Sequence, residues 1–181
     1  YVAGEPGQEQ LLEQCFMARP DWCPEPTQTI NYASCHDNMA LFDRLAVSAP
    51  EFSVTERIQM NKLAAAIVMT SQGVPFFQAG EEMLRSKPLP GGGFEHNSYC
   101  SPDSVNSIKW NDLSNPAYAA NADYYRGLIA FRKAHPTLRL TTAAAVWEQI
   151  HALEGLDPNV VGFHLRCSAE DPATAIIVLY N

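Results

Sequence analysis

Thr29-Ile30-Asn31-Tyr32-Ala33 has the pattern of a buried strand and leads, through Ser34-Cys35-His36-Asp37-Asn38, into the helical segment Met39-Ala40-Leu41-Phe42-Asp43-Arg44-Leu45. A second strand, Val74 to Gln78, is short and nearly continuously apolar, of the kind buried on both faces, and follows a long helical run that ends at Gly73. Strand, helix and strand in this order are typical of a parallel α/β sheet. Such sheets carry their chemistry where strands end and helices begin, and His36-Asp37-Asn38 stands at such a point.

Local signals mark the other elements of the chain. Ser53 and Glu56 form a capping box at the start of a helix. Apolar spacing and end signals predict helices over 7–18, 53–72, 115–134 and 142–149. From His151 onward the sequence pattern is that of three short strands joined by turns, which predicts a β-meander.

Composition narrows the class of partner. A net charge of −8 and a pI of about 5.0 argue against nucleic acid or an anionic membrane as the main binding partner. A neutral sugar polymer is compatible with this charge. No apolar run reaches the length of about 18 residues that a membrane span needs. The first residues lack an initiator Met and a signal pattern, so we expect a segment of a longer reading frame.

The cysteines and histidines indicate neither a disulfide framework nor a metal centre. The chain has five cysteines in an odd, scattered set, which fits free thiols and favours a reducing, cytoplasmic setting. The five histidines show no His-x-x-x-His spacing, so we expect no protein-built metal site and no cofactor.

A series of short motifs carries a family resemblance. In chain order they are Ile30-Asn31-Tyr32, His36-Asp37-Asn38, Pro75 to Glu82, Arg85-Ser86-Lys87, Asn97-Ser98-Tyr99, Ser101-Pro102-Asp103, Trp110 and Arg132-Lys133-Ala134-His135-Pro136. In this order and spacing the chain resembles type I pullulanases, the starch-debranching branch of glycoside hydrolase family 13. These enzymes hydrolyse α-1,6-glucosidic links with retention, on a (β/α)8 barrel followed by a β-sandwich.

The resemblance implies a fold for the whole chain. Residues 1–140 are expected to be the last two β/α units of the catalytic (β/α)8 TIM barrel, in the α/β class. Residues 141–181 are expected to be the start of an all-β C-terminal sandwich domain. Two strands cannot close a barrel, so the N-terminal part of the barrel is expected to be missing from this chain.

The resemblance assigns the sharpest role to Asp37, as the carboxylate that stabilises the transition state. His36 would bind sugar hydroxyls beside it, and Asn38 would line the cleft. The alternatives are ordinary structural roles. Asp37 could be the N-cap of the next helix, His36 a core or capping histidine, and Asn38 the residue of an Asx-turn.

The long loop after residue 86 supplies further candidates for substrate binding. Tyr99 is expected to stack on a sugar ring, and Asp103 and Asn106 to reach a sugar next to the cleavage site. Many relatives have an Arg four residues after this Asp, where the present chain has Ser107. The alternative for Asp103 and Asn106 is that of polar loop residues.

Other residues are assigned to the framework. Glu81 and Glu82 follow a strand, but the resemblance makes them structural, with Arg85 and Lys87 as expected partners. Phe76 and Phe77 are expected to fill the core, as aromatic residues on buried strands commonly do.

A retaining glycosidase needs two further carboxylates about 5–5.5 Å apart, a nucleophile and an acid/base. In the family both carboxylates stand at strand ends, one in an Arg-x-Asp context and the other in a Gly-Glu context, and no strand here ends in Arg-x-Asp. We therefore expect a fragment of an α-1,6-glucosidase that acts on pullulan, amylopectin or related α-glucans and is inactive by itself. The alternatives are an isoamylase-like or α-1,4-acting relative, or a non-catalytic carbohydrate-binding module.

Overall fold

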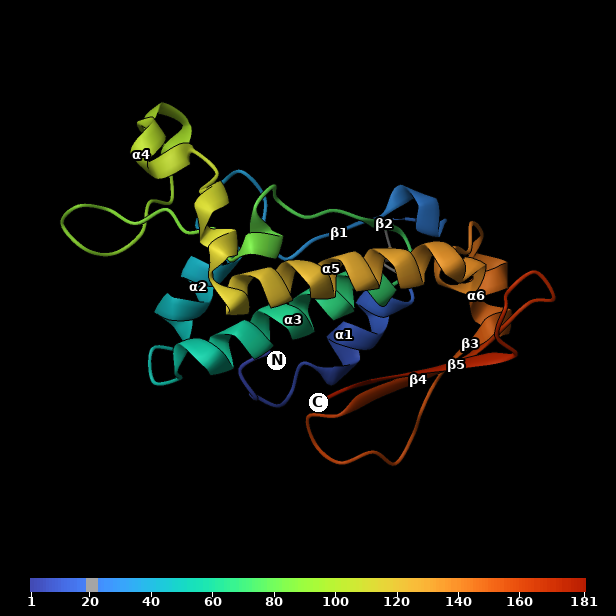
Figure 1. Ribbon diagram of the computed structural model, residues 1–181. Coiled ribbons are helices and arrows are strands. Elements are labelled where there is room, and N and C mark those ends of the chain that lie inside the picture. The colour runs from blue at the N-terminus through green and yellow to red at the C-terminus, as the bar shows by residue number, and fades with distance from the viewer. Residues whose placement is uncertain (19–22) are drawn as a thin grey trace. The chain divides into compact units, whose positions relative to one another are not determined.

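The structure is a computed structural model that describes residues 1–18 and 23–181 (Figure 1). The chain divides into two compact units, which are described separately. The first unit comprises Tyr1–Asn31, Ala66–Phe76 and Leu128–Asn181, and the second comprises Tyr32–Ala65 and Phe77–Gly127. Two long helices, α3 (Val54–Thr70) and α5 (Pro116–Ala134), contribute residues to both units.

The first unit contains the parallel strand pair. β1 (Ile30–Asn31) and β2 (Val74–Pro75) pair in parallel, with Ile30 opposite Val74. Both strands are shorter than the sequence predicts. The expectations that the first strand is buried and that the second is buried on both faces are wrong, because Ile30 is 62%, Val74 46% and Phe76 42% exposed. In the described residues this sheet has two strands, so each of them has one edge with no strand paired to it.

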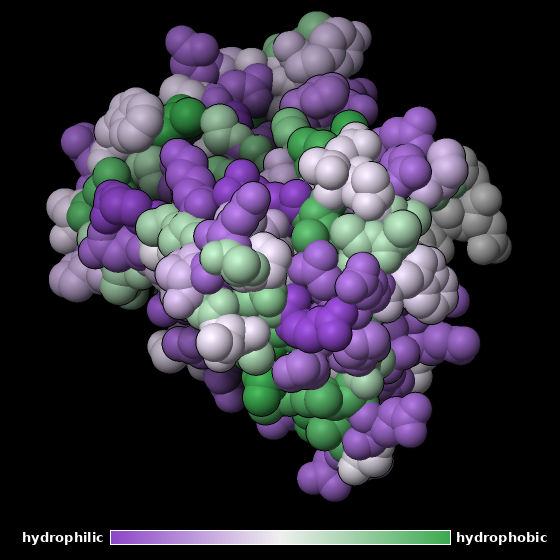
Figure 2. Space-filling model, turned by 90° about the vertical axis from the view of Figure 1, so that its right-hand side faces the viewer, coloured by the Kyte–Doolittle hydropathy of each residue, from purple (hydrophilic) through white to green (hydrophobic). Residues whose placement is uncertain are grey.

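The predicted β-meander is confirmed in the same unit. β3 (Ile150–Ala152), β4 (Val161–Arg166) and β5 (Ala175–Tyr180) form an antiparallel sheet in the order β3-β4-β5. Burial alternates along β5, as expected for a strand with one covered face. Figure 2 views the molecule from the right-hand side of Figure 1 and shows apolar side chains gathered near the bottom of that face.

An aromatic cluster forms the core of the first unit. Phe16, at the end of α1 (Glu9–Phe16), stacks on Phe163 of β4 with ring centroids 3.7 Å apart. Tyr180 meets both rings edge-on, at 6.2 and 6.3 Å. The two chain ends lie side by side (Figure 1), because the Tyr1 hydroxyl donates to the Tyr180 carbonyl at 2.8 Å. The predicted helix over 7–18 is thus confirmed as the shorter α1.

A buried glutamine joins distant segments of the first unit. Gln72 is fully buried, its Nε2 donates to the Thr137 carbonyl, and its Oε1 accepts from the Leu140 N–H, both at 2.9 Å. The next residue, Gly73, has φ of +93°, and a Cβ there would stand 2.1 Å from the Thr29 hydroxyl. Glycine is therefore needed where α3 gives way to β2.

The predicted helix ends are largely confirmed. At the start of α3 the Ser53 N–H donates to the Glu56 carboxylate at 2.7 Å, which completes the capping box. α5 begins at Pro116 and ends at Ala134, as expected. α6 (Ala143–Gln149) is capped by the Thr142 hydroxyl, which accepts from the Ala145 N–H.

The second unit holds the short helices around the candidate site. α2 (Leu41–Ser48) buries Leu41 and Leu45, and α4 (Asp103–Asn106) is a single turn within the long loop. Short 3-10 turns stand at Glu81–Met83, Ser98–Cys100 and Trp110–Ser114. This unit contains all six candidate site residues: His36, Asp37, Asn38, Tyr99, Asp103 and Asn106.

Candidate active site

The candidate site begins at a tight turn, defined here as the 36–38 turn, between β1 and α2. Asn38 has φ of +63°, a left-handed conformation that Asn tolerates better than most residues. The His36 and Asp37 side chains are 87% and 75% exposed, and His36 Nε2 lies 3.7 Å from Asp37 Oδ1. The turn therefore presents an imidazole and a carboxylate together at the surface of the second unit.

The structure removes two of the structural alternatives for this pair. The N-cap of α2 is Ala40, so Asp37 does not cap that helix. The exposed His36 ring is not a core histidine. The left-handed backbone of Asn38 gives this residue a part in making the turn.

A buried lysine, Lys87, binds the main chain of the 36–38 turn. Lys87 is 1% exposed, and its Nζ donates to the His36 carbonyl at 3.3 Å and the Asn38 carbonyl at 3.2 Å. The third contact of the ammonium group is the Ser98 hydroxyl, at 3.1 Å. Because Ser98 belongs to the long loop, one side chain joins that loop to the 36–38 turn.

The main chain of Lys87 is also fixed. Its N–H donates to Asp43 Oδ2 at 2.7 Å, and Asp43 is a buried residue of α2. Burial lowers the pKa of the Lys87 ammonium, as does the nearby Arg85, while Asp43 and Glu95 act in the opposite direction. Burial likewise raises the pKa of Asp43, against the effect of its hydrogen bonds and of Lys87.

The long loop presents an exposed aromatic ring beside this anchor. Tyr99 follows Ser98 directly and is 85% exposed, which suits stacking on a sugar ring. Asn106 is half-buried, and its amide nitrogen donates to the Ser98 and Ser101 carbonyls. The Asn106 side chain thus shapes the loop, and Oδ1 is its remaining polar atom.

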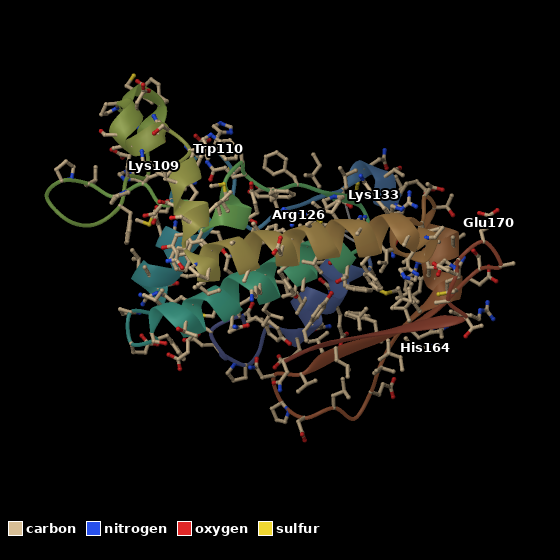
Figure 3. All side chains as sticks on the ribbon, in the orientation of Figure 1. Lys109, Trp110, Arg126, Lys133, His164 and Glu170 are labelled. Atoms are coloured by element: carbon tan, nitrogen blue, oxygen red, sulfur yellow. The ribbon has the colours of Figure 1, made fainter. Side chains whose placement is uncertain are left out.

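Asp103 stands in the first turn of α4, with an exposed side chain. Its carbonyl accepts from the Lys109 ammonium at 3.1 Å, and Lys109 also donates to the Ser104 carbonyl and the Ser107 hydroxyl. Figure 3 shows Lys109 next to α4. Ser107 thus takes part in closing the end of this helix.

Glu81 belongs to a buried hydrogen-bond network. Its carboxylate accepts from the Ser34 hydroxyl and, at 3.0 Å, from the Tyr125 hydroxyl. Burial raises the pKa of Glu81 despite these two donors, and burial next to Glu81 also raises the pKa of Tyr125. Glu81 therefore has a structural role within the second unit, as the family resemblance implies.

The expected partners of the two glutamates are wrong. The Glu82 carboxylate accepts from the Gly80 N–H at 3.0 Å. Arg85 donates to the Ala79 and Asn106 carbonyls, and Lys87 to the 36–38 turn and Ser98. Arg85 and Lys87 do not meet the glutamates because Gly80 and Leu84, both with left-handed backbone, change the direction of the chain at the two ends of the 3-10 turn Glu81–Met83. Phe76 does not fill the core either, since it is among the exposed apolar residues.

Within residues 1–18 and 23–181, no group of three or more His, Cys, Asp and Glu side chains is placed to hold a metal ion. In the same part of the chain, no helix has the length and apolarity to cross a membrane.

Comparison with known proteins gives the chain its relatives. It is 37% identical over 159 residues to the pullulanase of Bacillus subtilis, which covers 87% of this chain and 21% of that protein. It is 35% identical to the chloroplastic pullulanase 1 of Arabidopsis thaliana, over 81% of this chain and 18% of that protein. The chain is a pullulanase homologue. It spans about a fifth of the length of these two relatives, and no family model matches it.

Solved structures agree with this relationship. The Bacillus acidopullulyticus pullulanase matches 99% of the chain with a TM-score of 0.92 and 38% identity, over 22% of its own chain. A Paenibacillus barengoltzii pullulanase, solved with maltohexaose and α-cyclodextrin, matches 99% of the chain with a TM-score of 0.88 and 37% identity, over 28% of its own chain. The present chain therefore has the α/β fold of one part of these hydrolases.

Sequence reasoning missed the groups that support the site. Lys87 was expected to pair with a glutamate, and Asp43, Ser98 and Tyr125 were given no role there. Asp43 does carry a signal, since the residues three and four positions away on either side are all apolar: Met39, Ala40, Ala46 and Val47. The partners of Lys87 carry no sequence signal, because two of them are main-chain carbonyls, which every residue has.

Proposed function

We propose that this chain is part of a debranching enzyme that hydrolyses α-1,6-glucosidic links in pullulan, amylopectin or related α-glucans with retention. The observation that carries the proposal is the exposed His36–Asp37 pair on a turn fixed by Lys87, in a chain homologous to pullulanases. The maltohexaose bound to the Paenibacillus barengoltzii relative supports an α-glucan as the substrate.

In this proposal residues 1–140 supply the last two β/α units of a (β/α)8 barrel, and residues 141–181 begin a β-sandwich. The parallel pairing of β1 with β2 and the antiparallel sheet β3-β4-β5 support that division. The remaining strands, with the nucleophile and the acid/base, would come from outside this chain. Its five free cysteines are compatible with a reducing compartment such as the cytoplasm.

The proposed chemistry follows from the charge that develops during cleavage. The transition state of glycoside hydrolysis resembles an oxocarbenium ion, so the sugar ring gains positive charge. A carboxylate held near the ring stabilises that charge, and hydrogen bonds to sugar hydroxyls strengthen as the ring distorts. Asp37 would supply the carboxylate and His36 a hydroxyl contact. Tyr99, Asn38, Asp103 and Asn106 would line the adjoining sugar sites.

The proposal is tested in a pullulanase hybrid, in which this whole chain replaces the matching segment of the Bacillus acidopullulyticus enzyme. We expect the hybrid to release reducing sugar from pullulan. Asp37→Asn should lower its kcat by about 100-fold or more with little change in KM, because the lost interaction is strongest in the transition state.

The matched control is Asp123→Asn, which changes an exposed aspartate of the same unit that pairs with Arg126. This variant should keep kcat within about twofold, since exposed ion pairs contribute little. A folded hybrid in which Asp37→Asn leaves kcat unchanged would remove Asp37 from the catalytic machinery.

A further inference from the structure

The ammonium group of Lys87 is saturated by its three contacts. A lysine ammonium has three N–H donors, and here the acceptors are two main-chain carbonyls and one hydroxyl, at 3.1–3.3 Å. No donor remains for a substrate hydroxyl or a carboxylate. Lys87 therefore cannot act on a sugar directly while these contacts hold.

The two carbonyls belong to the residues on either side of Asp37. The His36 carbonyl lies in the peptide plane just before the Asp37 Cα, and the Asn38 carbonyl lies in the plane just after Asn38. Fixing both carbonyls holds the two ends of the turn around Asp37 and so restricts the directions open to its carboxylate. The Asp37 side chain itself is exposed, so side-chain packing does little to hold it. The main-chain anchor is what gives this exposed carboxylate a defined place.

The anchor is itself held from several sides. The Lys87 N–H donates to Asp43 of α2, and the Lys87 carbonyl accepts from the Glu95 N–H at 2.8 Å. The charged groups around the ammonium are Arg85, Asp43 and Glu95, together with the Cys35 thiol. An ammonium in such a place keeps a fixed position, because moving it would leave a buried charge without its hydrogen-bond acceptors.

We propose that Lys87 is a positioning residue for catalysis, which sets the direction of the Asp37 carboxylate and ties the Tyr99 loop to it. This inference rests on the proposed role of Asp37. It goes beyond that role by assigning the geometry of an exposed catalytic group to a buried cation that does not touch substrate. The same cation makes the turn and the loop move as one body.

The test is a double-mutant cycle in the pullulanase hybrid, with pullulan as substrate. Lys87→Met keeps most of the length of the side chain and removes all three donors. We expect it to lower kcat by about 10- to 100-fold with KM changed less than about threefold. The double variant Asp37→Asn/Lys87→Met should have a kcat less than about threefold below that of Asp37→Asn alone, because a carboxylate that is absent cannot be misplaced.

Two further variants separate positioning from general damage. Lys109→Met removes a lysine with the same kinds of acceptor, two carbonyls and a serine hydroxyl, so its effect should multiply with that of Asp37→Asn. Ser98→Ala removes one acceptor of Lys87 with little risk to folding. It should lower kcat several-fold and, like Lys87→Met, show no added loss in the Asp37→Asn background.

The outcomes are distinct. If Asp37→Asn keeps full activity, the proposed function of Asp37 fails, whatever Lys87 does. If Asp37→Asn is impaired but the losses from Lys87→Met and Ser98→Ala multiply with it, the role of Lys87 is structural and the positioning proposal fails alone. Unchanged kcat in both Lys87→Met and Ser98→Ala has the same consequence.

Discussion

Each unit of this chain contains a buried cation that binds main-chain carbonyls, but the carbonyls belong to different kinds of segment. In the first unit Arg132 donates to the Met69 and Ser71 carbonyls at 2.8 Å and to the Gly73 carbonyl at 2.7 Å. In the second unit Lys87 binds the carbonyls of the 36–38 turn. The same physical device thus serves two different segments.

The segment that Arg132 binds is the end of α3, where the last carbonyls of a helix lack partners within the helix. A cation there also meets the negative end of the helix dipole. The side chains of Ser71 and Gln72 are buried, so the segment presents no chemistry. Burial, and then the nearby Arg139, lower the pKa of Arg132 to about 10, which leaves it charged at neutral pH.

The 36–38 turn differs because its side chains are exposed. A cation that binds the carbonyls of a segment with buried side chains stabilises the fold. A cation that binds the carbonyls of a turn with an exposed carboxylate fixes the position of a functional group. A cation in the first kind of place should affect stability, and one in the second kind should affect catalysis. Substitutions at the two cations test this contrast.

The largest effect on stability is expected at Arg132. Arg132→Met would leave three carbonyls without their donor, at a cost of about 3 kcal/mol or more in local stability. In the pullulanase hybrid, hydrogen exchange of the peptide covering 66–76 should then rise by about 100-fold.

Arg126→Met is the matched control, because Arg126 lies on the same helix (Figure 3) but is exposed and paired with Asp123. It should leave exchange of the 66–76 peptide unchanged. Equal exchange in the Arg132→Met protein and its parent would mean that Arg132 does not close the end of α3.

A smaller, pH-dependent effect is expected at Asp171 in the same unit. Burial by itself would raise the pKa of Asp171, but hydrogen bonds from His135 at 2.7 Å and from the Ala173 and Thr137 N–H groups lower it to about 2. The ordinary aspartate pKa is about 3.9. A lowered pKa means that Asp171 stabilises the fold above pH 4 and that this contribution is lost as the pH falls through about 2.

Cleavage by pepsin can measure this contribution. At pH 5 we expect Asp171→Asn in the hybrid to be cleaved between residues 135 and 181 several-fold faster than the parent, and at pH 2 we expect equal rates. Glu170→Gln is the control, since Glu170 is exposed next to Asp171 (Figure 3). A ratio that does not change with pH would show that the ionised Asp171 carboxylate is not the stabilising group.

The same contrast explains what the sequence could predict. The ends of α5, the capping box of α3 and the β-meander come from signals within a few residues, and the structure confirms them. The bonds of Lys87 to the turn cross 49 and 51 residues, and that of Gln72 to Thr137 crosses 65. No local pattern encodes such bonds, because main-chain carbonyls carry no residue identity.

The position of His36–Asp37 after a predicted strand marks the pair as a candidate, and the family motif gives each residue a role, but neither signal gives their setting. Their exposure, the cap at Ala40 and the anchor at Lys87 depend on how α2 and the long loop pack. The roles of His36, Asp37, Asn38, Tyr99, Asp103 and Asn106 in binding glucan stay predictions.

A crystal structure of the Asp37→Asn hybrid with maltotetraose would show whether the 36–38 turn binds a sugar. We expect a glucose ring whose hydroxyls lie about 2.6–3.2 Å from the residue 37 amide and the His36 imidazole, while Lys87 stays bound to the turn. Maltotetraose bound in the hybrid's cleft, with the 36–38 turn facing away from every sugar ring, would contradict this expectation.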